Sequence, residues 1–237
     1  MKAAFFAKHG GPEELQYGEY KDPVLGAGQV MVDVHAASVN GADWRVVAGT
    51  YGPVAFFPYS PGRDFSGVVS ALGEGAKDFK IGDEVFGVCD VGTEAAYAEK
   101  VAIKEAIIAK KPAKLTHVES AAVALIGLTA LVSVEDTLQL KKGETILIQG
   151  GAGGVASFAI QIAKHIGARV ITTASAANHA YVKSLGADVA VAIWRVTPGC
   201  VVCSTTAAFD MLSAWRAISR RKRSCLRVMP FTISLFA

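Results

Sequence analysis

Residues 145–174 read TILIQGGAGGVASFAIQIAKHIGARVITTA, and this stretch decides the fold. Residues 144–149 are a mainly apolar run of strand length, residues 155–166 carry apolar side chains at helical spacing, and residues 168–174 form a second strand-like run. Gly167 is placed to end the helix, since glycine readily adopts the left-handed backbone found at many helix ends. A strand, a glycine-rich turn, a helix and a strand within about 30 residues predict the parallel β-α-β unit of a doubly wound sheet.

The glycine turn carries a nucleotide-binding pattern. Gly151, Gly153 and Ala156 give G-x-G-x-x-A, an accepted form of the dinucleotide fingerprint. In this interpretation Gly151 makes the tight turn, Gly153 lets backbone amides approach a pyrophosphate, and the small Ala156 lets helix and strand pack closely. The positive end of the helix then faces the phosphates. The alternative is that the glycines only form a turn and bind no ligand. The glycine turn lies between a strand and a helix, and this position favours nucleotide binding.

The end of the second strand indicates which dinucleotide would bind. An NAD enzyme places an acidic residue there to accept from the ribose 2′-hydroxyl, but no Asp or Glu occurs from Thr145 to Ala187. Donor or basic side chains occupy the region instead, namely Thr173, Ser175, Asn178, His179 and Lys183. The pattern favours NADP(H) over NAD(H). For His179 or Lys183 considered alone, the alternative is a solvent-exposed side chain on the next helix without a role in binding.

The residues before this unit have a β pattern. Val30, Val32 and Val34 alternate with other residues as on one face of a strand, and Gly82-Asp83 is a turn signal between apolar runs. We therefore expect a small β barrel over residues 1–115.

Thr116 and Glu119 have the spacing of a capping box and begin an apolar helical pattern. The predicted domains are a catalytic barrel at 1–115, a partial Rossmann NADP-binding domain at 116–193 and an atypical basic tail at 194–237.

Composition narrows the class of protein. The chain has 237 residues, 51% hydrophobic and 19% charged, with a net charge of +3, which excludes a disordered or collagen-like chain. Four scattered cysteines favour a reducing compartment, and no signal-peptide pattern is present. The longest apolar run, Ala121–Val134, is shorter than the roughly 20 residues that cross a bilayer. These features predict a cytoplasmic protein without a membrane partner.

The last 50 residues differ in character from the rest. Residues 188–237 hold 7 Lys+Arg against 2 Asp+Glu, whereas residues 1–187 hold 17 against 19. Cys200-x-x-Cys203 would need two more ligands for zinc, and only Cys225 follows. The basic run Arg220–Arg223 suggests nucleic acid, but chance is the favoured interpretation, so neither a metal nor a nucleic-acid partner is expected.

Six ordered motifs resemble one enzyme family. They are MKAAFFAKHGGPEEL (1–15), ASVNGADWRVVAGTYG (37–52), SPGRDFSGVV (60–69), GDEVFGV (82–88), ALIGLTAL (124–131) and KKGETILIQGGAGGVASFAIQIAK with GARVITTAS and SLGAD (141–188). Together they resemble the zinc-independent quinone oxidoreductase (zeta-crystallin-like) branch of the medium-chain dehydrogenase/reductase superfamily. The resemblance implies a GroES-like barrel followed by a Rossmann domain. It also implies NADPH-dependent reduction of quinones, enones or other activated double bonds, with the nicotinamide bound between the domains.

The resemblance also implies site residues. Asn40 and Thr129 would lie against the nicotinamide ribose and carboxamide, and Tyr51 would reach the substrate carbonyl. Asp43 is a separate candidate, as a polar cleft residue. The alternatives are loop packing for Tyr51, bonding within its own helix for Thr129 and an ordinary turn role for Asp43. The expected catalytic residues are thus Tyr51, Asn40 and Asp43. The expected cofactor-binding residues are Asn40, Thr129, Gly151, Ala152, Gly153, Gly154, Val155, Thr173, Ser175, Asn178 and Lys183.

No metal is expected. In the zinc-dependent relatives a Cys ligand stands where this chain has Asn40, and Gly-His-Glu stands where it has Gly62-Arg63-Asp64. An amide and an arginine do not supply the soft ligands of a tetrahedral zinc site. The structural-zinc lobe needs four closely spaced cysteines, and Cys89 stands alone between Gly73 and Lys110. Asp64 is a further polar candidate with an ordinary turn role as its alternative, and Arg63 receives no role.

The resemblance ends near Asp188. Residues 189–194 offer a third strand, but the later strands of a complete doubly wound sheet have no counterpart in the sequence. A frameshift or truncation near Asp188 is the simplest interpretation, and a divergent tail is the alternative. We therefore expect an open edge on the central strand. The expected function is an NADPH-dependent quinone or enone reductase acting on a small molecule. The alternative is a catalytically impaired pseudoenzyme that retains nucleotide or partner binding, and a homodimer remains open.

Overall fold

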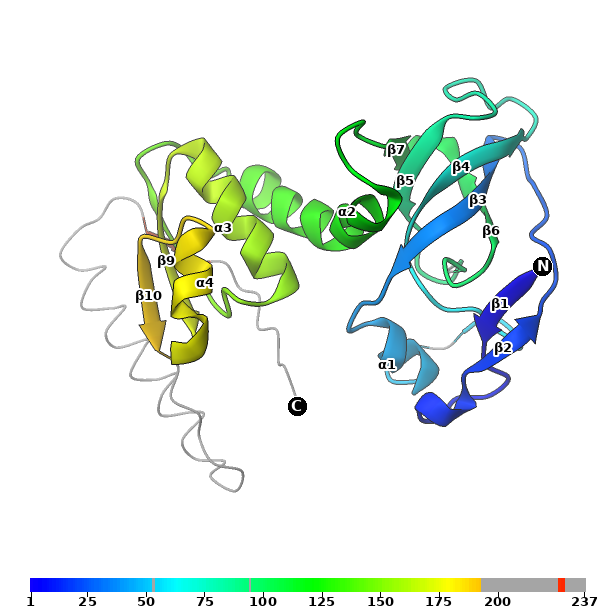
Figure 1. Cartoon of the computed structure of the whole chain (residues 1–237), viewed down its shortest axis with the longest axis horizontal. Helices are drawn as coiled ribbons and strands as arrows, with labels where there is room; N and C mark the ends of the chain where they lie inside the picture. The colour runs from blue at the N-terminus through cyan, green and yellow to red at the C-terminus, as the bar shows by residue number, and fades with distance from the viewer. Residues whose placement is uncertain (53, 94, 193–225, 229–237) are drawn as a thin grey trace. The chain divides into compact units, whose positions relative to one another are not determined.

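The computed structural model describes residues 1–52, 54–93, 95–192 and 226–228 (Figure 1). The residues group into two compact units, Met1–Leu125 and a second unit from Ile126 onward. Each unit has its own buried apolar core.

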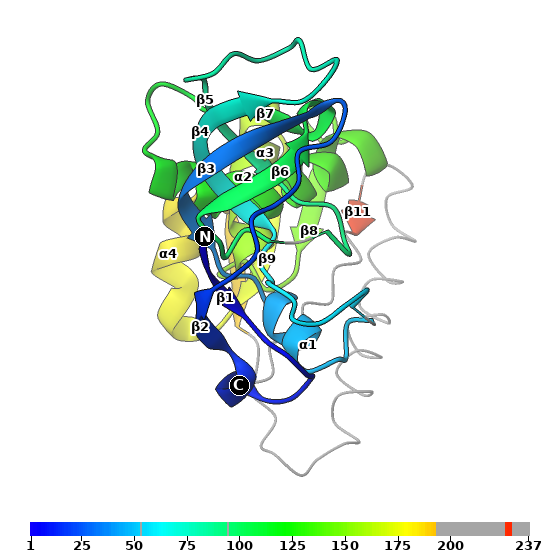
Figure 2. The same cartoon turned by 90° about the vertical axis from the view of Figure 1, so that its right-hand side faces the viewer.

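The first unit is an antiparallel β structure. Its larger sheet has five strands in the order β6-β3-β4-β5-β7, and β3, β4, β5 and β7 lie side by side in Figure 2. These strands are β3 (Gln29–Ser38), β4 (Asp64–Leu72), β5 (Glu84–Val88), β6 (Lys100–Lys104) and β7 (Ile108–Lys110). The other elements are β1 (Lys2–Phe5), its partner β2 (Gln16–Glu19), η1 (Pro12–Glu14), α1 (Asp43–Val47) and η2 (Glu105–Ile107).

The alternation predicted for β3 is confirmed. Val30 and Val32 are fully buried, and Val34 packs against the same core cluster as they do. Alternate side chains of a strand point to the same face, so one face of β3 builds the core of this unit. Figure 1 shows the long β3 and β4 arrows running beside each other, as their pairing requires.

Close backbone approach between β3 and β4 makes Gly67 a strong determinant of stability. A Cβ at Gly67 would collide with the backbone oxygen of Asp33 on β3. We expect Gly67→Ala to lower the free energy of unfolding by about 1 to 3 kcal/mol, because rigid backbone must move to admit the methyl group. Gly18→Ala on β2 is the control, since a Cβ there meets nothing within 4 Å. Urea unfolding of both variants measures the difference, and equal stability would show that the two strands separate easily.

The predicted capping box is confirmed at the start of α2 (His117–Leu131). The Glu119 N–H donates to Thr116 Oγ1 at 3.2 Å, and the Thr116 N–H donates to Glu119 Oε2 at 2.8 Å. These two bonds satisfy backbone donors that a helix start leaves without intrahelical partners. The helix continues into a π-helical turn, η3 (Val132–Thr137).

The combined helix His117–Thr137 has 21 residues and is apolar enough, by length and composition only, to cross a membrane. It is longer than the run Ala121–Val134 that the sequence marked as too short for a span. The core helix of a soluble protein meets the same two criteria.

The second unit contains the predicted parallel β-α-β crossover. Its elements are β8 (Thr145–Ile148), α3 (Gly154–Ile166), β9 (Arg169–Ala174), η4 (Ala176–Asn178), α4 (His179–Ser184), β10 (Val189–Ala192) and β11 (Leu226–Val228). The sheet order is β10-β9-β8-β11, and every pairing is parallel. Gly167 ends α3 with a left-handed φ of 88°, as predicted, and β10 supplies the expected third strand.

The core of this unit joins α3 to the sheet. Ala159, Ile160 and Ala163 on α3 are fully buried in the same cluster as Ile146 and Val170 on β8 and β9. Small side chains on the buried face of α3 let the helix lie close to the strands, which fixes the position of its N-terminus beyond the end of β8.

The expectation of an open edge on the central strand is wrong over three residues. β11 pairs in parallel with β8, with Leu226 opposite Thr145 and Val228 opposite Leu147. The unpaired backbone groups of an edge strand accept any extended segment, so this pairing needs no recognisable sequence motif. The motifs Cys200-x-x-Cys203 and Arg220–Arg223 lie outside the described residues.

Candidate functional site

The glycine turn after β8 is held against the end of β9. The Gly150 N–H donates to Thr173 Oγ1 at 3.0 Å, and the Gly151 N–H donates to the Thr173 carbonyl oxygen at 2.8 Å. The Gly153 N–H donates back to the Gly150 oxygen at 2.8 Å. The turn therefore has a fixed path from the strand into α3.

The tight turn that was predicted at Gly151 is made by Gly150. Gly150 has the left-handed φ of 65°, so Gly150 makes the tight turn. Gly151 is buried, and a Cβ there would collide with Thr172 Oγ1 and lie 3.1 Å from Ile160 Cδ1. Gly151 thus permits the close packing of helix and strand that the sequence assigned to Ala156 alone, although Ala156 is also buried in the core.

The N-terminus of α3 suits an anion. Gly153 is the N-cap without a side-chain hydrogen bond to the helix, and the first turn holds no acidic residue. The first amides of a helix have no intrahelical acceptor, so those of Gly154, Val155 and Ala156 are available to a ligand. These amides and the dipole of a helix of 13 residues favour a phosphate at this point.

The end of β9 presents neutral and basic groups. Ser175, Asn178 and Lys183 are exposed, and Asn178 Nδ2 donates to Ser175 Oγ at 3.1 Å. Thr173 is buried with its hydroxyl on Gly150, so it fixes the turn. His179 Nε2 lies 3.3 Å from the Ala174 carbonyl oxygen. The structure therefore brings most of the predicted cofactor residues of this unit to one end of the parallel sheet.

The first unit contains a polar cluster around Asn40. The Asn40 N–H donates to Asp43 Oδ2 at 2.7 Å, and its side-chain Nδ2 donates to Asp64 Oδ2 at 2.9 Å. Tyr97 donates its hydroxyl to Asp43 Oδ2 at 2.6 Å, and Ser38 donates its hydroxyl to Asp64 Oδ2 at 2.6 Å. We call these five residues the Asn40 cluster.

Both carboxylates of the cluster are buried. Asp64 has no exposed surface, and both side-chain hydrogen bonds that it accepts from Ser38 and Asn40 fall on Oδ2. Burial raises the pKa of Asp64, while the hydrogen bonds from Asn40 and Ser38 oppose that rise. Burial, with the nearby Asp43 carboxylate, also raises the pKa of the Tyr97 hydroxyl, so Tyr97 stays a donor at neutral pH.

Asn40 and Asp43 were both candidate site residues, and the structure joins them by a hydrogen bond. It also adds partners that carried no assigned role. Ser38 and Tyr97 carried no signal in the sequence, and Asp64 was named without a function. Tyr51 is 43% exposed, and among the described residues no hydrogen bond joins it to Asn40 or Asp43.

Thr129 is half-buried on α2, in the second unit. Its carbonyl oxygen accepts from the Ser133 hydroxyl at 2.7 Å, so the helix holds the backbone of this residue.

The residues that replace the zinc ligands of the zinc-dependent relatives, Asn40 and Arg63, make other contacts. Arg63 donates through Nε to the Cys89 carbonyl oxygen at 3.1 Å, and Asn40 donates to Asp64. Within the described parts of the chain, no three His, Cys, Asp or Glu side chains are grouped so that they could hold a metal ion.

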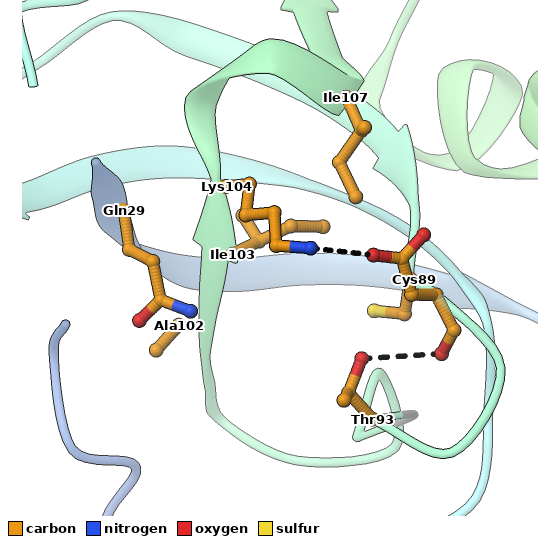
Figure 3. Close-up of a pocket in the computed structure, with 8 residues that line it drawn as sticks. Gln29, Cys89, Thr93, Ala102, Ile103, Lys104 and Ile107 are labelled. Atoms are coloured by element: carbon orange, nitrogen blue, oxygen red, sulfur yellow. Dashed lines mark hydrogen bonds and ion pairs between the residues drawn. The ribbon is translucent and has the colours of Figure 1, made fainter. Parts of the chain in front are cut away.

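A small pocket lies elsewhere in the first unit, near Cys89 (Figure 3). Its volume is about 70 Å³, and an ion pair of 3.4 Å between Lys104 and Asp90 lies beside it. The pocket contains none of the predicted site residues and is too small for a dinucleotide. It is lined by Gln29, Cys89, Asp90, Thr93, Ala102, Ile103, Lys104 and Ile107.

Comparisons with known proteins identify the class. Residues 26–113 match the alcohol dehydrogenase GroES-like domain. A GroES-like domain followed by a parallel β-α-β unit is the domain order of the medium-chain dehydrogenases/reductases. The chain is similar in sequence and in structure to quinone oxidoreductases of this superfamily. The predicted family resemblance and fold class are both confirmed.

Individual relatives support this assignment. The human quinone oxidoreductase is 34% identical over 175 residues, which are 73% of this chain and 53% of that protein. The 2-methylene-furan-3-one reductase of Solanum lycopersicum is 34% identical over 203 residues, 81% of this chain and 52% of that protein. The structure of the Escherichia coli quinone oxidoreductase complexed with NADPH matches with a TM-score of 0.74 at 31% identity. The match includes 81% of this chain and 58% of the Escherichia coli chain. The chain thus spans about half the length of the curated relatives that it matches.

Proposed function

We propose that this chain is an NADPH-dependent oxidoreductase that transfers a hydride to quinones or to enone-type double bonds without a metal. The observation that carries the proposal is the start of α3, where an acid-free first turn follows the glycine turn. The absence of acidic residues from Thr145 to Ala187 supports NADPH over NADH. The composition supports a cytoplasmic location.

The second unit would bind the cofactor through its adenosine diphosphate part. The backbone of Gly151, Ala152, Gly153, Gly154 and Val155 offers amides to the diphosphate, with Thr173 fixing the turn. Ser175, Asn178 and Lys183 would receive the 2′-phosphate, because hydroxyl, amide and ammonium groups all donate to phosphate oxygens. We also place Thr129 beside the nicotinamide, as the family resemblance implies. When bound, NADPH supplies the hydride.

The first unit would supply groups for the reacting atoms. Asn40 and Asp43 are held rigidly by the Asn40 cluster, so they can position a ligand without large reorganisation. The exposed Tyr51 hydroxyl would donate to the substrate carbonyl oxygen, where negative charge develops as the hydride arrives. An amide at residue 40 and an arginine at residue 63 support catalysis by hydrogen bonds in place of a zinc ion.

The direct test is NADPH oxidation by the purified chain with a naphthoquinone and, separately, an α,β-unsaturated ketone. We expect turnover that a strong chelator leaves unchanged. Loss of turnover on chelation would contradict metal-free chemistry. Thermal stabilisation by NADPH without turnover would select the pseudoenzyme that retains nucleotide binding.

The preference for NADPH is tested at Lys183. We expect Lys183→Ala to weaken NADPH binding about 10-fold and to leave NADH binding unchanged, because only NADPH carries the 2′-phosphate that the ammonium would contact. Lys141→Ala, in the exposed turn before β8, is the control. Fluorescence titration with both nucleotides measures the change. Equal losses for NADPH and NADH would remove Lys183 from 2′-phosphate recognition.

A further inference from the structure

Asn40 is held by two buried carboxylates at once. Asp43 accepts the Asn40 backbone N–H at 2.7 Å and returns its own N–H to the Asn40 carbonyl oxygen at 3.0 Å. Asp64 accepts from the side-chain Nδ2 at 2.9 Å. The first contact fixes the backbone of Asn40, and the second fixes the rotation of its amide group.

The contact with Asp64 gives that amide a defined polarity. An asparagine amide has a donor end and an acceptor end of nearly equal shape, and its partners decide which end points where. An ionised carboxylate accepts only, so Asp64 must receive Nδ2. The Ser38 hydroxyl donates to the same oxygen at 2.6 Å, which reinforces the acceptor role of Asp64. The carbonyl Oδ1 of Asn40 is then the end left for a ligand.

Folding alone does not explain an aspartate at residue 64. Its side chain is fully buried, and the hydrogen bonds from Ser38 and Asn40 both fall on Oδ2. A buried carboxylate destabilises the folded state unless it is compensated. Burial and the Asp43 carboxylate raise the pKa of Asp64, whereas hydrogen bonds from Asn40, Ser38 and the backbone of Leu125 lower it. Groups that oppose stability in this way are common where function requires them.

We infer that Asp64 is a positioning residue, which orients the Asn40 amide so that Oδ1 accepts a hydrogen bond from the bound nicotinamide nucleotide. The inference rests on the proposed function and adds the chemistry of the contact, since the ligand must bring a donor. In the nicotinamide riboside part of NADPH the donors are the carboxamide NH2 and the ribose hydroxyls. Both supply the same chemistry, and the experiment distinguishes them.

Three variants test the orientation. Asp64→Asn allows the Asn40 amide to face either way, so the fixed acceptor is lost. Asn40→Asp places two carboxylates against each other. The double variant Asn40→Asp/Asp64→Asn restores one inward hydrogen bond, now donated by the amide at residue 64, and again leaves an acceptor oxygen outward. Asp33→Asn is the matched control, because Asp33 also accepts from a serine hydroxyl, that of Ser70 at 2.9 Å, but does not touch the cluster.

Binding of NADPH gives the first measurement. We expect Asp64→Asn and Asn40→Asp each to weaken binding about 10-fold, the double variant to recover most of this loss, and Asp33→Asn to bind as the wild type does. Losses in the single variants that simply add in the double variant would overturn the inference.

An NADPH analogue identifies the donor. In the reduced 3-acetylpyridine analogue a methyl group replaces the carboxamide NH2. If the carboxamide is the donor, the wild type and the double variant bind NADPH about 10-fold more tightly than the analogue, and Asp64→Asn does not discriminate. If a ribose hydroxyl is the donor, each single variant weakens both nucleotides equally and the double variant recovers both. Loss of binding without recovery in either nucleotide would overturn the inference.

Two measurements without the cofactor separate this inference from the proposed function. The side-chain amide resonances of Asn40 should shift as Asp64 titrates, and this shift should vanish in Asp64→Asn. The second measurement is the pH dependence of the melting temperature. Since the folded-state pKa of Asp64 is raised, its carboxyl favours the folded state at low pH, and that contribution is lost as pH rises through the folded pKa.

The groups facing Asp64 are Asn40, Asp43, Ser38, the backbone of Leu125 and the Tyr97 hydroxyl, and Asp43 is the other carboxylate among them. Asp64→Asn should therefore gain in melting temperature relative to the wild type between acid and neutral pH. If Asp64→Asn melts lower than the wild type by the same amount at every pH and Asn40 shows no titration, Asp64 is structural and the inference fails. A wild type that shows both signatures but neither binds nor oxidises NADPH would contradict the proposed function and not the amide orientation.

Discussion

Gly154→Asp should weaken NADPH binding by about 100-fold without unfolding the chain. Gly154 is the exposed first residue of α3, and a Cβ there meets its nearest atom, Ile126 Cδ1, at 3.4 Å, an ordinary contact. An acidic residue in the first turn interacts favourably with the helix dipole, by about 0.3 to 1 kcal/mol. The same carboxylate would repel a bound diphosphate. At about 4 Å and an effective dielectric constant near 20, that repulsion is about 4 kcal/mol, and water reduces it at an exposed site.

Gly154→Asn is the matched control, because it has the same shape without the charge. Fluorescence titration with NADPH and thermal unfolding of both variants make the comparison. We expect Gly154→Asn to retain most of the affinity and Gly154→Asp to lose it while melting no lower. If both variants bind NADPH equally well, the diphosphate does not sit at the start of α3.

Tyr51→Phe should lower kcat for a quinone by about 100-fold and leave NADPH binding unchanged. Removal of a positioned acid typically lowers the rate by 10² to 10⁴, because the transition state loses a hydrogen bond to the developing oxyanion. Tyr51 is 43% exposed, so its hydroxyl can reach a ligand without disturbing the core, and the phenylalanine keeps the ring.

Tyr17→Phe provides the control for this experiment, since Tyr17 lies on β2 and is 74% exposed. Steady-state kinetics at saturating NADPH separate kcat from KM. A Tyr51→Phe enzyme with the kcat of the wild type would assign Tyr51 to loop packing, which was its alternative from the sequence.

Much of the fold was predictable because local patterns determine it. Alternating valines placed one face of β3 in the core, and the reciprocal hydrogen bonds of Thr116 and Glu119 follow from their spacing. The change from strand to helix periodicity around residues 145–174 determined the β-α-β unit. The partner of β8 on its far edge was not predictable, because β11 has three residues and pairs through backbone groups alone.

The assignment of roles within the glycine turn was only partly predictable. Four glycines surround Ala152, and each can adopt a left-handed backbone, so sequence spacing does not say which one does. The structure assigns the turn to Gly150, while packing against Thr172 and Ile160 requires a glycine at 151. Thr172 is 21 positions and Ile160 is 9 positions from Gly151, so these contacts depend on the tertiary fold.

The Asn40 cluster shows the same limit. Asn40 and Asp43 are close in sequence and were named together, but Tyr97 is 54 residues from Asp43, and Asp64 is 24 residues from Asn40. Antiparallel pairing of β3 and β4 places Ser38 opposite Asp64, and no local pattern indicates that register. The burial of Asp64, on which the orientation of Asn40 depends, is likewise a property of the folded unit.

The central claim is that the amides at the start of α3 bind the diphosphate of NADPH. Backbone amide resonances of the labelled chain, followed during titration with NADPH, test it most directly. We expect large, saturable shifts at Gly154, Val155 and Ala156 and smaller ones near Lys183, with little change in β3 and β4. Saturable binding that leaves the three amides of α3 unshifted would contradict it.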